Sequence, residues 1–187
     1  QGEQGGETLS EVELLHNCIF LLNAGHETTT NLIGNGVHAL LTQRAAWDRL
    51  VASPVAEPNL LPTAVEELLR FESPLQLNNR LSTEPLRIGE VEVPAGNFIT
   101  LAIGSANHDE TVFHQPATLD VARKPNPHLA FGQGAHACAG MNVARLEARI
   151  AFAGLLERCP GLQLRGTPER DPRIRFRGWR TLPVSLG

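Results

Sequence analysis

The stretch Phe131–Gly140, FGQGAHACAG, decides how the rest of this chain is interpreted. It holds one cysteine, Cys138, in a segment with three glycines, and its only bulky side chains are Phe131 and His136. Glycine lets the backbone come close to a neighbouring group and turn its N–H groups toward that group. A phenylalanine and three glycines around one cysteine therefore favour a thiol that is presented to a large planar ligand.

Three other interpretations of Cys138 compete with a planar ligand. An isolated cysteine is often a small apolar residue of the core. Cys138 could join His128 and His136 in a zinc site, although no fourth ligand lies at a suitable spacing. It could also be a nucleophile activated by the start of the helix expected after it. The glycines and the phenylalanine favour the planar ligand over these three.

The composition sets broad limits on fold and function. A chain of 187 residues can form one domain with a substantial core, and 42% hydrophobic with 19% charged residues is ordinary for a soluble globular protein. The net charge of −4 argues against nucleic acid as a partner. Fifteen of the sixteen basic residues are arginine, so we expect several of them to hold carboxylates in fixed geometry.

The cysteines and the apolar segments indicate the cellular compartment of the protein. Cys18, Cys138 and Cys159 are odd in number and contain no CxxC pair, which argues against a disulfide framework and favours a reducing, cytoplasmic setting. The most apolar run, Cys18–Leu22, is too short to span a membrane, and we find no signal peptide. The polar, glycine-rich start without methionine, Gln1–Gly6, predicts that the chain was cut from a longer one.

Helical periodicity dominates both ends of the chain. Ser10 and Glu13 form a capping box, and apolar residues recur behind them at helical spacing on more than one face, so we expect a long helix that runs through the interior. A short helix should end at Ser53-Pro54. The four predicted helices are Ser10–Thr42, Ala45–Ala52, Leu60–Phe71 and Ala139–Arg158.

Short strands are predicted between and after these helices. Glycine and proline turns separate the middle ones, and Ser105–Pro127 has little periodicity and should be a long loop. The predicted strands are Leu77–Leu81, Leu86–Ile88, Val91–Val93, Phe98–Ile103, Leu162–Arg165, Ile174–Phe176 and Leu182–Val184. The fold class is therefore mainly α with small β-sheets, in one domain.

Two polar motifs interrupt the predicted helices. Ala24–Thr29, AGHETT, places an acid and threonines in an apolar helix, where a threonine hydroxyl can bond back to a carbonyl and open the helix toward a cavity. Such an opening suits water-assisted proton delivery, and a polar turn on a partly exposed helix is an equally good interpretation. The second motif, Glu67–Arg70, has the spacing of an ordinary surface ion pair.

The three motifs together resemble those of one family, the cytochrome P450 haem-thiolate monooxygenases of the soluble bacterial type. Phe131–Gly140 resembles the family's cysteine signature, Ala24–Thr29 its oxygen-binding motif and Glu67–Arg70 its E-x-x-R motif, in the family's order. The resemblance implies that residues 1–187 are the C-terminal, haem-binding portion of that fold, without its N-terminal half. That portion comprises the oxygen-binding helix, the E-x-x-R helix, the cysteine loop and the helix after it.

The resemblance also implies roles for single residues. Cys138 would be the axial ligand of the haem iron, and Glu27 with Thr28 would be the catalytic acid–alcohol pair that delivers protons to dioxygen. The remaining haem-binding residues would be His136, Arg80, Phe131, Gly132, His128 and Ala24.

Three further groups of residues receive roles in the same way. Glu67, Arg70 and Arg123 would form a structural triad, and Arg145 would lie on the face where an acidic redox partner docks. The substrate pocket, mostly apolar or amide in character, would be lined by Leu21, Ala24, Leu75, Gln76, Leu77 and Asn78.

Two functional hypotheses follow from the resemblance. The first is a monooxygenase that hydroxylates a small, largely apolar molecule with electrons from a ferredoxin-type partner. The second is a truncated remnant without independent activity, which acts as an interaction or assembly module or needs a separate N-terminal chain. Apolar helix faces meant for the absent half would be exposed, so we expect a dimer or a separate N-terminal half to cover them.

Overall fold

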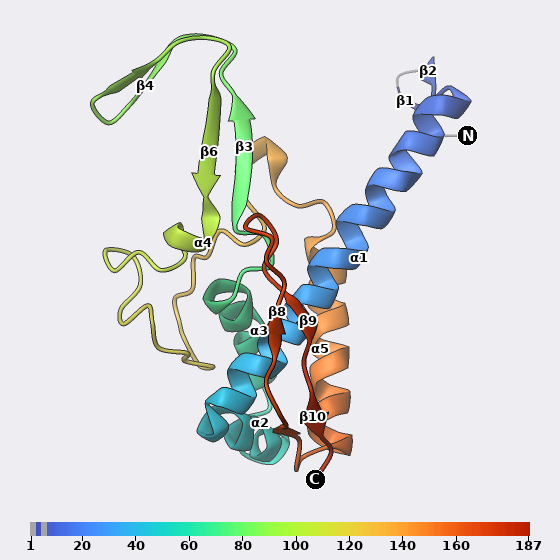
Figure 1. Cartoon of the computed structure of the whole chain (residues 1–187), viewed down its shortest axis with the longest axis vertical. Helices are drawn as coiled ribbons and strands as arrows, with labels where there is room; N and C mark the ends of the chain where they lie inside the picture. Colours follow the sequence, from blue (N-terminus) through green and yellow to red (C-terminus); the bar gives the residue numbers. More distant parts are fainter. Residues whose placement is uncertain (1–2, 5–6) are drawn as a thin grey trace.

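The longest element, α1 (Glu11–Thr42), crosses the whole molecule, and the other helices gather around its C-terminal half (Figure 1). The structure is a computed structural model that describes residues 3–4 and 7–187. The predicted capping box is confirmed: the Glu13 N–H donates to Ser10 Oγ at 3.3 Å, and the Ser10 N–H donates to the Glu13 carboxylate at 2.9 Å. A short pair of strands, β1 (Glu3–Gln4) and β2 (Glu7–Thr8), precedes the helix.

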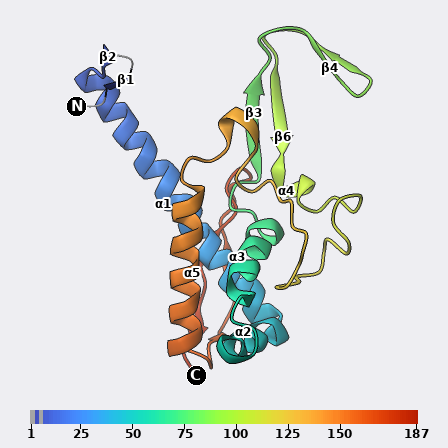
Figure 2. The same ribbon diagram turned by 180° about the vertical axis from the view of Figure 1, so that it is seen from behind.

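The prediction that α1 runs through the interior is wrong for its N-terminal half. Residues 11–26 are all exposed, and the buried residues of α1 lie between Leu32 and Leu40. Figures 1 and 2 show from opposite sides that the first half extends away from the other elements. The apolar periodicity predicted the helix correctly, but no described element packs against this half.

The second helix, α2 (Arg44–Ala56), is longer than predicted and contains Pro54. The prediction that Ser53-Pro54 ends it is wrong. Proline lacks the N–H that would normally bond to the carbonyl four residues earlier, here Leu50. The buried Ser53 hydroxyl donates to that carbonyl at 2.7 Å and satisfies it, so the helix continues past Pro54.

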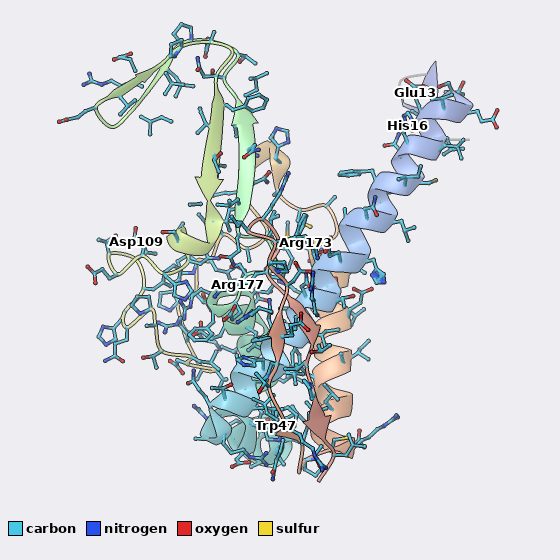
Figure 3. All side chains as sticks on the ribbon, viewed as in Figure 1. Glu13, His16, Trp47, Asp109, Arg173 and Arg177 are labelled. Atoms are coloured by element: carbon cyan, nitrogen blue, oxygen red, sulfur yellow. The ribbon has the colours of Figure 1, made fainter. Side chains whose placement is uncertain are left out.

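The core lies where α1, α2, α3 (Leu60–Phe71) and α5 (Met141–Arg158) meet. Its largest fully buried apolar side chains include Trp47 and Phe152, and Figure 3 labels Trp47 at the lower end of the molecule. A Cβ on Gly36 would lie 2.5 Å from the Phe152 ring, so only glycine allows α1 and α5 to approach this closely. The predicted bounds of α3 are confirmed, and α5 begins two residues later than predicted.

Two antiparallel ladders extend from the helical body (Figure 1). β3 (Leu77–Leu81) pairs with β6 (Phe98–Ala102), and β4 (Leu86–Ile88) pairs with β5 (Val91–Val93). These strands confirm the prediction except at Ile103, which is buried and begins the short helix α4 (Ile103–Ala106). Residues 107–127 contain no helix or strand, as expected for a long loop.

The C-terminal segment folds back over α1 as two small ladders (Figures 1 and 2). β7 (Gln163–Leu164) pairs with β10 (Val184–Ser185), and β8 (Glu169–Arg170) pairs with β9 (Trp179–Thr181). The predicted strand Ile174–Phe176 is wrong: these residues belong to the loop between β8 and β9, and only Phe176 forms an isolated bridge, to Leu75. The loop forms because the Asp171 carboxylate accepts from the Arg173 N–H at 3.0 Å, which turns the chain.

Candidate functional site

The cysteine loop is closed by its own backbone. The Cys138 N–H donates to the Phe131 carbonyl at 2.8 Å, and the Gly132 N–H donates to the Leu129 carbonyl at 2.8 Å. Gly132 and Gly134 have φ angles of +68° and +75°, which other L-residues rarely adopt. A short 3₁₀ turn, η1 (Gly134–His136), precedes the cysteine, and the Cys138 thiol is free and exposed.

The surroundings of this thiol fit a flat ligand with one sulfur donor. In both views the loop lies between β3 and α1, and a Cβ added at Gly134 or at Gly25 of α1 would meet nothing within 4 Å (Figures 1 and 2). A zinc site fits less well, because the described residues contain no group of three or more His, Cys, Asp or Glu side chains able to hold a metal ion. One exposed thiolate beside open glycine backbone is a donor set suited to haem.

The three basic side chains assigned to haem differ in their environments. His136 is exposed within η1, and Arg80 of β3 is half-buried, with Nη1 donating to the Asn79 carbonyl at 2.9 Å. The side chain of His128 is only 4% exposed, and its Nε2 lies 3.0 Å from the Glu66 carboxylate. His136 and Arg80 can therefore reach an added ligand, whereas His128 is directed into the protein.

The AGHETT motif lies where the free half of α1 meets the packed half. The Thr28 hydroxyl donates to the Ala24 carbonyl at 2.8 Å, as expected for a threonine that bonds back to its own helix. Glu27 is half-buried and forms an ion pair with Arg173, whose guanidinium also holds Asp171 through two contacts of 2.9 Å. Figure 3 places Arg173 beside the middle of α1. The motif is thus a partly exposed polar stretch, and the predicted local opening of the helix is wrong, because α1 is unbroken from Glu11 to Thr42.

Glu67 and Arg70 are not the surface pair that their spacing suggests. Both side chains are completely buried, and Arg70 Nε and Nη2 each donate to the Glu67 carboxylate at 2.8 Å. Arg123 adds a third charge, with Nε 3.0 Å from Glu67 Oε2. Backbone carbonyls of the long loop accept the remaining Arg70 donors, and these belong to Asn107, Pro116 and Thr118. The structure therefore brings the predicted triad together as a satisfied buried cluster.

Arg145, assigned by resemblance to a docking face, has partners inside the molecule. Its Nε and Nη2 donate to the Glu66 carboxylate at 2.8 and 2.9 Å, and its guanidinium lies 4.6 Å from the centre of the Phe131 ring. Burial by itself raises the pKa of Glu66, but hydrogen bonds from His128 and Arg145 outweigh it and lower this pKa to about 2. Glu66 is a residue that the sequence analysis missed.

The residues assigned to the substrate pocket lie on two separate elements. Leu21 and Ala24 are exposed on α1, whereas Leu75, Gln76, Leu77 and Asn78 are half-buried around the start of β3. Two surface hollows of about 240 and 500 Å³ occur among the described residues, lined by residues of segments 43–63 and 115–124. Neither hollow includes Cys138, Glu27 or Thr28.

Comparison with known proteins identifies the family. The cytochrome P450 family model matches residues 1–176. The chain belongs to the cytochrome P450 family. Family membership implies haem as the cofactor and confirms the resemblance inferred from the three motifs. Among the residues described, no helix has a stretch long and apolar enough to cross a membrane.

The curated relatives are bacterial. The chain is 43% identical over 181 residues to the biotin biosynthesis cytochrome P450 of Bacillus subtilis, covering 96% of this chain and 45% of that protein. It is 45% identical over 189 residues to cytochrome P450 107B1 of Saccharopolyspora erythraea, covering 98% of this chain and 45% of that protein. The chain thus spans less than half the length of these relatives.

Solved structures agree with this fold. The structure of CYP109E1 from Bacillus megaterium with testosterone matches with a TM-score of 0.93 at 34% identity, over 100% of this chain and 51% of that one. P450BioI in complex with an acyl carrier protein carrying hexadec-9Z-enoic acid matches with a TM-score of 0.90 at 43% identity, over 96% of this chain and 46% of that one. The fold is a mainly helical fragment of the P450 fold with small sheets.

Proposed function

We propose that residues 1–187 are the C-terminal, haem-holding portion of a monooxygenase that activates dioxygen to hydroxylate a small, largely apolar molecule. The observation that carries the proposal is the closed glycine loop, which lies between β3 and α1 and contains the free, exposed Cys138. When bound, the haem supplies an iron whose thiolate ligand favours cleavage of the O–O bond.

Each assigned side chain has a definite task in this proposal. Cys138 would bind the iron, and the open space beside Gly134 of the loop and Gly25 of α1 would allow the flat ligand to approach. Arg80 and His136 would contact the two propionates, because both basic side chains can reach an added ligand and can donate hydrogen bonds to a carboxylate. Glu27 and Thr28 place a carboxyl group and a hydroxyl group next to each other on α1, an arrangement that suits dioxygen rather than peroxide as oxidant.

Arg173 extends this proposal to the C-terminal loop. Its ion pair with Glu27 holds the carboxylate at a fixed place on α1, since the same guanidinium is anchored by Asp171 and lies 5.8 Å from the centre of the Phe176 ring. The pKa of Asp171 is lowered to about 2, chiefly by hydrogen bonds from Arg173. We assign Arg173 the task of positioning Glu27 for proton delivery.

The residues at the start of β3 and on α1 indicate the kind of substrate. Leu21, Leu75, Gln76, Leu77 and Asn78 combine apolar and amide side chains, which suits a neutral apolar molecule with one polar group. An acyl chain on a carrier protein is a second substrate class, because the similar P450BioI was solved with such a complex. Electrons would come from a ferredoxin-type protein. The three free thiols favour a cytoplasmic location.

A second candidate function rests on the exposed apolar side chains of α1. Leu15, Ile19 and Phe20 are each more than half exposed. A surface of this kind usually binds a partner. The alternative is therefore an interaction or assembly module, in which this face of α1 binds a second copy of the chain or another chain.

One reconstitution experiment tests the proposal. The chain is mixed with haem, reduced and exposed to carbon monoxide, and the Soret band is recorded. We expect a strongly red-shifted band that disappears in Cys138→Ala but persists in Cys18→Ala, whose exposed thiol lies on α1. No bound haem in the unsubstituted chain would contradict monooxygenase activity of this chain alone and leave the assembly module.

A further inference from the structure

We propose that Arg145 is a positioning residue that fixes the cysteine loop against α3, and not a docking charge for a redox partner. The proposal rests on the haem-thiolate site proposed above. Arg145 belongs to α5, Glu66 to α3 and Phe131 to the cysteine loop, so one guanidinium joins three segments.

Arg145 commits two of its five N–H donors to a partner inside the protein. Nε and Nη2 donate to the two Glu66 carboxylate oxygens at 2.8 and 2.9 Å. The flat face of the guanidinium lies 4.6 Å from the centre of the Phe131 ring, within the range of a cation–π contact. The side chain is only 25% exposed. A docking charge would instead need a free and hydrated guanidinium.

Glu66 is itself held in place from a second side. His128 Nε2 lies 3.0 Å from its carboxylate, and His128 Nδ1 accepts from the Ala130 N–H at 3.2 Å, which ties the pair to the chain just before Phe131. The low pKa of Glu66 keeps the carboxylate ionised at neutral pH, where it holds the fully charged Arg145. The four residues form a clamp, which we define as Arg145, Glu66, His128 and Phe131.

The clamp is connected to Cys138 by a backbone hydrogen bond. The Phe131 carbonyl accepts the Cys138 N–H at 2.8 Å, so the residue beneath the guanidinium is also the one that closes the loop. The pKa of Arg145 is raised chiefly by its hydrogen bonds to Glu66, so the guanidinium stays charged in the clamp. Arg145 can therefore set the position of the loop through Phe131.

The substitution Arg145→Lys distinguishes between a clamp and a docking charge. Lysine keeps the positive charge that docking needs, but it has neither the planar fork for Glu66 nor the flat face for Phe131. A clamp is thus lost in Arg145→Lys, whereas a docking site is largely retained. Glu66→Gln should have the same effect as Arg145→Lys if the clamp exists, and should leave docking unimpaired if it does not.

The first test needs no haem. Amide hydrogen exchange is measured on the haem-free chain and on Arg145→Lys, Glu66→Gln and the control Arg158→Lys, which changes an exposed arginine at the end of α5. We expect the Cys138 amide to exchange about tenfold faster in the first two variants, the effect of losing one charge-assisted bidentate pair. Core amides such as Leu40 and Phe152 should not change, which distinguishes loosening of the loop from unfolding.

The second test uses the reconstituted protein. The fraction of the reduced carbon monoxide complex that keeps the thiolate ligand should fall in Arg145→Lys and in Glu66→Gln, and should stay unchanged in Arg158→Lys. Unchanged loop exchange together with full thiolate ligation in Arg145→Lys would overturn the clamp. If neither the unsubstituted chain nor any variant binds haem, the proposed function fails. The exchange experiment on the haem-free chain then decides by itself whether the clamp exists. Should Arg145→Lys unfold, Phe131→Leu gives the same comparison.

Discussion

The two halves of α1 have similar spacing of apolar residues and opposite environments. Leu22 in the first half is 70% exposed, whereas Leu40 in the second half is completely buried. Both halves are helical, and both carry apolar side chains at helical spacing. Periodicity therefore predicts that a segment is a helix, but it does not predict which of its faces finds a partner.

Different interactions hold the two halves. The first depends on its Ser10 cap and on its own backbone hydrogen bonds, while the second packs against α2, α3 and α5. Glu27 and Thr28 lie where the environment changes from exposed to buried. The candidate proton-delivery pair thus has packed helix on one side and open helix on the other, which is where a ligand could approach it.

The largest expected effect on stability concerns the buried ion pair of Glu67 and Arg70 in α3, which packs against the C-terminal half of α1. Arg70→Ala should destabilise the chain by about 3–5 kcal/mol, because it leaves the buried Glu67 carboxylate without its main partner. Equilibrium unfolding in urea measures the loss. Arg49→Ala is the control, since the Arg49–Glu57 pair is exposed and should contribute little. Equal losses in the two variants would contradict the buried cluster.

The direct test of the comparison uses the same substitution in both halves of α1. Leu40→Ala should cost about 2–5 kcal/mol of unfolding free energy, as expected for a fully buried leucine. Leu22→Ala should change it by less than about 0.5 kcal/mol, as expected for a surface site. Urea unfolding measures both. A loss at Leu22 as large as that at Leu40 would mean that the first half is covered in solution, for example in a dimer.

Acid unfolding compares two carboxylates, Glu66 in the packed region and Glu13 at the free end of α1. The folded pKa of Glu66 is about 2, below its ordinary value of 4.5, so the unfolded chain binds the extra proton. The stabilisation is present above pH 4.5 and is lost as the pH falls toward 2. It amounts to at most about 3 kcal/mol.

The measurement is the unfolding free energy between pH 6 and pH 2.5. In Glu66→Gln the unfolding free energy should decrease less steeply as the pH is lowered. The pKa of Glu13 is also lowered, by hydrogen bonds from Ser10, but Glu13 is exposed and belongs to the free half. Glu13→Gln should therefore leave the acid-dependent fall unchanged. A slope that remains the same in Glu66→Gln would show that other groups control it.

The smallest expected effect on stability is confined to the start of α1. Ser10→Ala removes the cap of α1 and should cost about 1 kcal/mol of helix stability. Since the first half is not packed, the loss should appear as faster amide exchange near the helix start and not as a lower global unfolding free energy. Slower or unchanged exchange there would show that contacts with another chain hold this half. Thr42→Ala, at the other end of α1, is the matched control.

Most of the secondary structure could be predicted, and each error has a local cause. The bounds of α3, β3, β4 and β5 follow from their apolar spacing and flanking turns. The end of α2 was wrong because the buried Ser53 hydroxyl replaces the donor that proline lacks. β8 and β9 were missed because two- and three-residue strands, Glu169–Arg170 and Trp179–Thr181, have too few positions for alternation to be recognised.

Long-range pairs in the candidate site could not be predicted from local sequence. Glu27 with Arg173 and Glu66 with Arg145 join segments far apart in the chain, and no motif contains both partners. Glu67 and Arg70 were found, but their burial was not, because an acid and a base three residues apart have the same spacing on a surface and in a core. The resemblance to the family supplied the triad, and the fold supplied its carbonyl partners.

The sequence by itself determined the cysteine loop, the capped helix and the family. These depend on neighbouring residues: glycines at Gly132 and Gly134 permit positive φ, and Ser10 with Glu13 satisfies the start of α1. Only the tertiary structure decided which half of α1 is covered and which arginines are fixed. Burial and ion pairing depend on what packs against a side chain, and in this chain those partners come from distant segments.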